Sequence, residues 1–232
     1  MAKFSKLTIV VPQVNKTFRD YSSPSTKRAN IEKIRKINTD YGTMCERWGN
    51  VFEIDKNVLI AFIATESGGK PNLVSFVGCC YGLMQVSPEA VFDAAVKFDL
   101  TGHPLPTEAR TVLSSIPNLL GKSELTSSTR AAIIKRLYDP NFNILCGTMV
   151  LRWLLERFST LLTGAQLNKA VVGYNAGAYT RSINTGTRAN KIPIDTTTLV
   201  NMKTVPRETR NYLVKMFGVN GFLQLIYKDK AI

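Results

Sequence analysis

The chain has 232 residues, of which 44% are hydrophobic and 20% are charged, and Lys and Arg outnumber Asp and Glu by 30 to 17. This composition excludes wholesale disorder, and no window holds the roughly 18–20 consecutive apolar residues that a membrane span needs. The four cysteines lack zinc-site spacing, so we expect free thiols, no metal and no cofactor.

The first 44 residues are expected to form a basic extension. Residues 1–36 hold nine Lys or Arg against two acids, and isoleucines three apart predict a short helix over 29–37. Helical periodicity resumes near residue 45, where we place the start of a main domain, 45–218. Residues 219–232 are expected to be a tail.

Residues 56–66 carry a clear helix signal. Asp55 is a candidate N-cap, and Gly68 and Gly69 follow the helix as a stop. A turn-rich segment comes next, over 71–86. Ser87 then caps a further helix that begins at Pro88.

The second half of the chain is predicted to be helical with irregular insertions. We expect loops with short helices over 99–128, within an extended insertion, 99–136, and an irregular excursion over 180–204. The predicted helices are 141–160, 165–175 and 206–218. Strand signals are few, so the predicted class is mainly α.

Glu66 is the lone acid at the end of an apolar helix. It shares a helix face with Leu59, Phe62 and Ile63, and the helix dipole disfavours negative charge at that end. Both features favour the protonated carboxyl that a general acid requires. The spacing alone also fits an ordinary acid exposed at a helix end.

Cleavage of a glycosidic bond commonly uses two carboxylates, and no Asp or Glu lies between Glu66 and Gln85. Glu89 and Asp93 come next, in the first turns of the following helix. A mechanism with one acid is chemically possible where an N-acetyl sugar supplies its own 2-acetamido oxygen.

Four motifs in order resemble the lysozyme-like soluble lytic transglycosylases of the Slt type. They are ESGGKPNLVSFVGCCYGLMQVSPEA from Glu66, LYDPNFNILCGTMVLRWLL from Leu137, AVVGYNAGAY from Ala170 and PRETRNYLVKMFG from Pro206. The resemblance covers about 55–218.

The resemblance implies a helical lysozyme-like fold, with a small irregular or turn-rich region beside the active site, that binds peptidoglycan glycan strands. It implies cleavage of the β-1,4 bond between N-acetylmuramic acid and N-acetylglucosamine with a 1,6-anhydro product. Glu66 would protonate the leaving oxygen and then take the proton of the muramyl 6-hydroxyl.

The resemblance also assigns substrate contacts. These are Ser75, Met84, Gln85, Tyr174, Asn175 and Glu208. Met84 and Tyr174 also fit core packing, and Asn175 fits a hydrogen bond at a helix end.

The chain departs from the family pattern at Gly78–Gly82, which is one residue longer than expected and contains Cys79 and Cys80. The extra residue affects the local register and the direction of Gln85. We expect the two adjacent cysteine side chains to diverge and not to bridge, and to act as small apolar groups.

No secretory signal is evident, and residues 180–232 are basic like the first 36 residues. We therefore expect a phage virion-associated enzyme that opens the host cell wall, with basic ends that contact DNA or virion proteins. Diffuse charge also fits solubility alone. Alternatives are a muramidase-type hydrolase acting as an endolysin and a non-catalytic peptidoglycan-binding protein.

Overall fold

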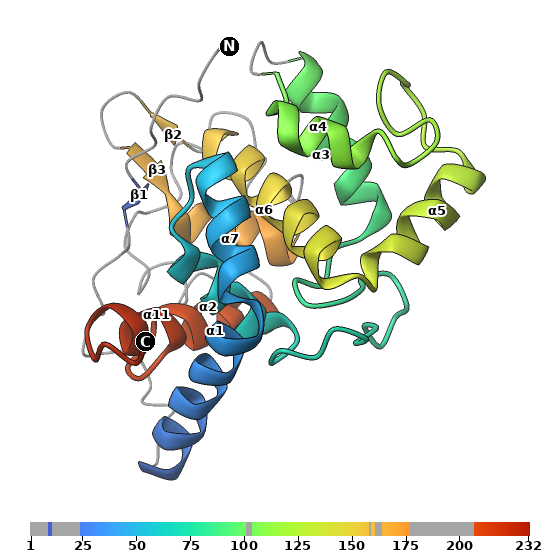
Figure 1. Ribbon diagram of the computed structural model, residues 1–232. Coiled ribbons are helices and arrows are strands. Elements are labelled where there is room, and N and C mark those ends of the chain that lie inside the picture. The colour runs from blue at the N-terminus through green and yellow to red at the C-terminus, as the bar shows by residue number, and fades with distance from the viewer. Residues whose placement is uncertain (1–8, 11–23, 101–103, 158, 161–163, 177–206) are drawn as a thin grey trace. The chain divides into compact units, whose positions relative to one another are not determined.

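The computed structural model is mainly helical, as predicted (Figure 1). It describes residues 9–10, 24–100, 104–157, 159–160, 164–176 and 207–232. The chain forms two compact units, and their boundaries fall within helices α1 and α6. Unit one contains residues 37–153, and unit two contains 7–36 and 154–232. The predicted excursion over 180–204 lies outside the described residues.

The helices are α1 (Pro24–Phe52), α2 (Lys56–Glu66), α3 (Pro88–Leu100), α4 (Thr107–Leu113), α5 (Ser127–Leu137), α6 (Pro140–Arg157), α7 (Leu167–Ala176), α10 (Arg207–Phe217) and α11 (Phe222–Tyr227). The short strands are β1 (Ile9–Val10), β2 (Ser159–Thr160) and β3 (Gly164–Gln166).

Helix α2 lies in the core of unit one. Every residue from 58 to 64 is buried, which is the pattern of a helix that is apolar on all sides. The Asp55 side chain accepts a hydrogen bond from Asn57 N at 2.9 Å, which confirms the predicted N-cap. Gly68 and Gly69 have φ angles of 62° and 86°, and this left-handed backbone ends the helix as predicted.

Helix α1 is much longer than predicted. The helix expected over 29–37 is part of one continuous helix that includes the proposed domain boundary at residue 45. Its buried positions within unit one include Ile37, Cys45, Trp48 and Phe52. Because these apolar residues recur at helical spacing, packing maintains the helix through its polar stretches.

A buried arginine ties α6 to the end of α1 within unit one. The Arg152 side chain is 1% exposed, and its Nη1 donates to Phe52 O at 3.0 Å. The Glu53 Oε2 atom lies 3.9 Å from the same nitrogen. A buried charge is tolerated only where such partners replace water.

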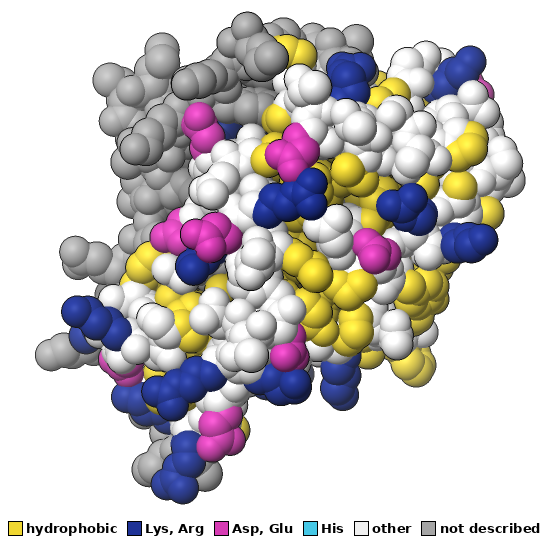
Figure 2. Space-filling view, in the orientation of Figure 1, with side chains coloured by type: hydrophobic (Ala, Val, Ile, Leu, Met, Phe, Trp, Pro, Cys, Tyr) yellow, Lys and Arg dark blue, Asp and Glu magenta, His cyan; other side chains and the backbone are white. Residues whose placement is uncertain are grey.

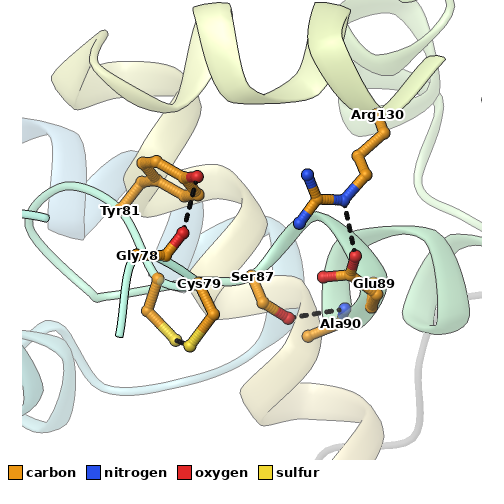
Figure 3. A network of polar contacts seen from close by, with 8 residues as sticks. Gly78, Cys79, Tyr81, Ser87, Glu89, Ala90 and Arg130 are labelled. Atoms are coloured by element: carbon orange, nitrogen blue, oxygen red, sulfur yellow. Dashed lines mark hydrogen bonds and ion pairs between the residues drawn. The ribbon is translucent and has the colours of Figure 1, made fainter. Parts of the chain in front are cut away.

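Helices α3 and α5 pack together in unit one, joined by a surface ion pair. Arg130 Nε donates to Glu89 Oε1 at 2.8 Å, and Ser87 Oγ caps α3 by accepting from Ala90 N at 3.1 Å (Figure 3). Burial alone would raise the pKa of the Glu89 carboxyl, but the hydrogen bond from Arg130 outweighs it and lowers that pKa below its usual value. Helix α5, which was not predicted, occupies the end of the proposed insertion.

In unit two, β3 lies between β1 and β2, parallel to β1 and antiparallel to β2. This small sheet was not predicted. Residues 219–232, expected to be a tail, include α11, which buries Phe222, Leu223, Leu225 and Ile226. The final residues also contact the first turns of α1, through a 2.6 Å Lys27–Asp229 ion pair and an Arg35 Nε bond to Ala231 O at 3.1 Å.

Charged side chains on the drawn face are mixed in sign. Lys and Arg stand singly or in small groups with Asp and Glu among them (Figure 2). Of the 18 basic residues counted at the two ends of the sequence, eight lie outside the described ranges. Of the helices in the described part of the chain, none combines the length and apolar character needed to cross a membrane.

Candidate functional site

Glu66 is the last residue of α2, and its side chain is half-buried. Leu59, Phe62 and Ile63 on the same face are fully buried, as predicted. Immediately after Glu66 the backbone turns back, with Ser67 N and Gly68 N donating to Ile63 O at 3.1 and 3.0 Å. The carboxyl group is therefore placed by a rigid core helix and a closed helix end.

The segment after α2 forms a small double turn. Val74 pairs with Tyr81, and Tyr81 pairs in turn with Val86, each as an isolated antiparallel bridge. Gly78 N donates to Ser75 O at 2.8 Å and closes a tight turn at the tip. Phe76 and Val77 lie on this tip and are strongly exposed.

Ser75 is the centre of the tip. Its hydroxyl oxygen accepts hydrogen bonds from Cys79 N and Cys80 N, each at 3.1 Å, and Ser75 N donates to Cys80 O at 2.9 Å. The side chain is half-buried. What the structure shows is a hydroxyl that organises the turn, and its contact with the substrate stays a prediction.

Met84 and Gln85 lie within the second turn, between the paired residues Tyr81 and Val86. The Met84 side chain is fully buried, which corresponds to the packing role considered from the sequence. Gln85 Nε2 donates to Leu73 O at 2.9 Å and to Gly82 O at 2.8 Å, so its amide holds the turn itself. The backbone of Gln85 has a φ of 46°, in the left-handed region. Substrate contacts by these two residues stay predictions.

Asn143 holds this turn in place and was not identified as a site residue from the sequence. Its Oδ1 accepts from Met84 N at 2.8 Å, while Nδ2 donates to Tyr81 O at 2.8 Å and to Leu137 O at 2.9 Å. The side chain is fully buried. One carboxamide thus satisfies three buried backbone groups from two segments that are distant in sequence.

Asn143 reaches this position because α6 starts at a fixed residue. Asp139 Oδ1 accepts from Phe142 N at 2.7 Å as an N-cap, and Pro140 occupies the first helical position. Asn143 lies in the first turn of that helix. The Asp-Pro pair indicates the start of this helix in the sequence. The sequence alone does not indicate that this start places Asn143 against the turn.

Two glycines allow the close approach of the turn to α6. A methyl group on Gly82 would overlap Asn143 Nδ2 and would lie 2.5 Å from Leu137 O, and its φ is 76°. A methyl group on Gly147 would lie 2.5 Å from Met84 Sδ. The turn at Gly82–Gln85 and the part of α6 around Gly147 are therefore complementary parts of one packing interface.

The side chains of Cys79 and Cys80 were predicted to diverge, but they lie together. Their sulfur atoms lie 3.3 Å apart, because the turn around Ser75 directs both side chains the same way. The pKa of the Cys80 thiol is raised to about 12, mainly by burial and then by the neighbouring Cys79 thiol, and Glu66 adds to this shift when it is ionised. The thiol pair is thus within electrostatic range of the candidate acid.

The remaining predicted residues belong to unit two. Tyr174 and Asn175 are half-buried at the end of α7, and Glu208 is exposed in the first turn of α10. Thr209 Oγ1 donates to Asn175 Oδ1 at 2.7 Å and connects the third motif with the fourth. This bond supports the structural role considered for Asn175, and the substrate contacts of all three residues stay predictions.

Within the described residues, no three His, Cys, Asp or Glu side chains gather as a possible metal site.

The comparisons with known proteins agree with the fold. The family model described as "Transglycosylase SLT domain" matches residues 43–110 and 122–194, together more than half of the chain. The 70 kDa soluble lytic transglycosylase SLT70 from Escherichia coli is similar in structure, with a TM-score of 0.53 and 24% sequence identity over 82% of this chain. The match covers 25% of that protein's length. Among curated proteins, no sequence matches this chain.

We predict that Asn143→Ala lowers the free energy of unfolding by about 3 kcal/mol or more, because three buried backbone groups lose their partner. Urea unfolding followed by circular dichroism would measure the change. The control is Asn211→Ala on an exposed position of α10, which should change stability little. A loss of unfolding free energy for Asn143→Ala as small as that of the control would contradict the role of Asn143 in holding the turn.

A double-mutant cycle tests the packing of Met84 on Gly147. Gly147→Ala should destabilise the protein by about 1–3 kcal/mol through overpacking, and Met84→Ala by about 2–5 kcal/mol through a cavity. The double variant should be more stable than the sum predicts, by about 1 kcal/mol, because truncation removes the Met84 Sδ and Cε atoms that the new methyl group would meet, while the Cβ atom at 2.7 Å remains.

The matched control for the cycle is Gly42→Ala in α1, where the new methyl group meets only the movable Asn38 side chain. Gly42→Ala should be nearly neutral and should show no coupling to Met84→Ala. Additive effects of Gly147→Ala and Met84→Ala would contradict the packing interface.

Proposed function

This chain belongs to the transglycosylase SLT domain family, and we propose that it is a peptidoglycan lytic transglycosylase. The reaction would cleave the β-1,4 bond between N-acetylmuramic acid and N-acetylglucosamine and form a 1,6-anhydro-muramyl end. The observation that carries the proposal is the position of Glu66, a lone carboxyl at the end of a buried helix beside a tightly held turn.

In the proposed mechanism, the Glu66 carboxyl donates its proton to the glycosidic oxygen as the bond breaks. The 2-acetamido group of the muramyl residue stabilises the positive charge that develops at C1. The resulting Glu66 carboxylate then removes the proton of the 6-hydroxyl, whose oxygen forms the new bond to C1. Glu66 ends the cycle protonated, and no water is consumed.

The surroundings of Glu66 support the acid step. The helix dipole disfavours a negative charge at the C-terminus of α2, and partial burial acts in the same direction. Glu89, the next acid along the chain, is engaged by Arg130. A mechanism with a single acid is therefore consistent with the described part of unit one.

We predict that purified protein releases fragments with anhydro-muramyl ends from peptidoglycan, and that Glu66→Gln lowers the rate by at least about a hundredfold, since general acid–base catalysis contributes about that much or more. Mass spectrometry of the released fragments would measure both. The control is Glu124→Gln, which removes an exposed carboxylate elsewhere in unit one and should retain activity.

Each other result has a distinct meaning. Reducing ends in place of anhydro ends would identify a muramidase-type hydrolase and contradict the proposed product. Release of fragments by Glu66→Gln at the wild-type rate would exclude Glu66 as the acid. Binding to peptidoglycan with no release by wild type would favour a non-catalytic peptidoglycan-binding protein. The thermal unfolding of Glu66→Gln should match that of wild type, so that lost activity is not lost folding.

We further propose that the protein is carried in a phage particle and opens the host cell wall locally during genome entry. The proposal is supported by the nine basic against two acidic residues in 1–36 and the nine against three in 180–232. Basic segments of this kind suit contacts with DNA or acidic virion proteins and should depend on salt.

Mass spectrometry of particles purified from infected cells is expected to find this protein at a constant copy number per particle. Its retention should weaken as the salt concentration of the wash increases, because the proposed contacts are ionic. Detection in the infected-cell lysate together with absence from purified particles would instead identify a free endolysin.

A further inference from the structure

We propose that Cys79 and Cys80 form a modification site, a vicinal dithiol that low-molecular-weight disulfides close into a Cys79–Cys80 disulfide bond. The sulfur atoms are 3.3 Å apart, and both side chains are partly exposed. The other two cysteines, Cys45 and Cys146, are buried. Reagents in solvent therefore reach the pair and not the remaining thiols. The inference concerns chemistry beyond the proposed glycan cleavage.

The turn around Ser75 holds the two thiols together before any reaction. Ser75 Oγ accepts from both cysteine amides, and the Cys79 sulfur lies 3.7 Å from the same oxygen. Tyr81 OH donates to Gly78 O at 2.9 Å and fixes the residue before the pair (Figure 3). Figure 3 shows the two sulfur atoms facing one another at this turn. The arrangement lowers the entropic cost of joining them.

The reaction is a thiol–disulfide exchange in two steps. The Cys79 thiolate attacks one sulfur of a disulfide RSSR, forms a mixed disulfide and releases RS⁻. The Cys80 sulfur, after loss of its proton, attacks the Cys79 sulfur, forms the Cys79–Cys80 bond and releases the second RS⁻. The two cysteine protons leave with the two RS⁻ groups as two RSH molecules. The cysteines are oxidised by two electrons and RSSR is reduced.

Cys79 is the residue that starts the exchange. Burial and the neighbouring thiol raise the pKa of the Cys80 thiol to about 12, so Cys80 keeps its proton at neutral pH and is the weaker initial nucleophile. Formation of the mixed disulfide removes the Cys79 thiol hydrogen bond that contributes to this shift. Cys80 is then better placed to complete the bond.

Closure should alter the candidate site. Consecutive Cα atoms lie about 3.8 Å apart, which is shorter than the about 4.4–6.8 Å usual for a disulfide, so closure forms a strained ring that includes the peptide joining the two cysteines. The N–H group of that peptide is Cys80 N, one of the two donors to Ser75 Oγ. Oxidation therefore disturbs Ser75, whose hydrogen-bond partner Cys80 is within electrostatic range of Glu66. The effect on activity, unlike the chemistry of the thiols, rests on the proposed function.

The chemical step is tested by treating native full-length protein with oxidised glutathione, followed by alkylation and peptide mass spectrometry. In wild type, the peptide that carries Cys79 and Cys80 should lose two hydrogen atoms, resist alkylation and recover both thiols on reduction. Cys79→Ser and Cys80→Ser cannot close the bond, so each should retain a mixed disulfide or a free thiol. Cys45 and Cys146 should stay unmodified until the protein is unfolded.

A stable glutathione adduct on wild type, or two thiols that remain open to alkylation after exposure to the oxidant, would overturn the proposal. Both results are read on wild type, so neither depends on whether the serine variants fold.

Activity supplies the second readout. Oxidised wild type should release glycan fragments roughly tenfold more slowly, because displacement of positioning groups by about 1 Å can cost up to about a hundredfold in rate. A reductant should restore the rate, and a serine variant shown by mass to keep its free thiol should be insensitive to the oxidant. If protein shown by mass to be oxidised keeps full activity, the proposed effect of disulfide closure on Ser75 and on activity is overturned. An inactive reduced wild type would contradict the proposed function, while the mass measurement would still decide the thiol chemistry.

Discussion

The carboxamide of Asn143 is the interaction on which the candidate site of unit one depends. It satisfies the backbone of Met84, Tyr81 and Leu137 at once, and it is fully buried. A turn that must lie against a helix leaves backbone groups without water, and each must find a partner. Asn has one acceptor and two donors in a side chain short enough to provide them from the first turn of α6. The glycines at 82 and 147 complete the arrangement by leaving room for the approach.

Glu66 has a position that combines rigidity with partial burial. The helix that carries it is enclosed by the core along residues 58–64, and the backbone turns sharply directly after the carboxyl-bearing residue. A general acid must be held accurately and must stay neutral until it acts. In the proposed mechanism, a half-buried residue at the C-terminal end of a core helix suits both conditions, because the scaffold is fixed and the local dipole opposes ionisation.

Ser75 connects glycan chemistry with thiol chemistry in the proposals made for this protein. Its hydroxyl accepts two amides of the cysteine pair, so any change in that peptide reaches the serine directly. In unit two a comparable bond joins motifs that are far apart in sequence, since Thr209 donates to Asn175. In both units, residues that resemble substrate contacts in the sequence also carry the internal hydrogen bonds of the fold.

The sequence by itself determined the mainly helical class, the helix over 56–66 with its Asp55 cap and glycine stop, and the order of the four family motifs. These are local properties, set by capping chemistry and by the spacing of apolar residues. Tertiary structure decided the continuous α1, the helices α5 and α11 and the short strands, because burial outweighs weak local preference. It also brought the Cys79 and Cys80 sulfurs together and placed Asn143 under the turn. Hydrogen bonds between distant segments fix those positions, and no periodicity in the sequence encodes them.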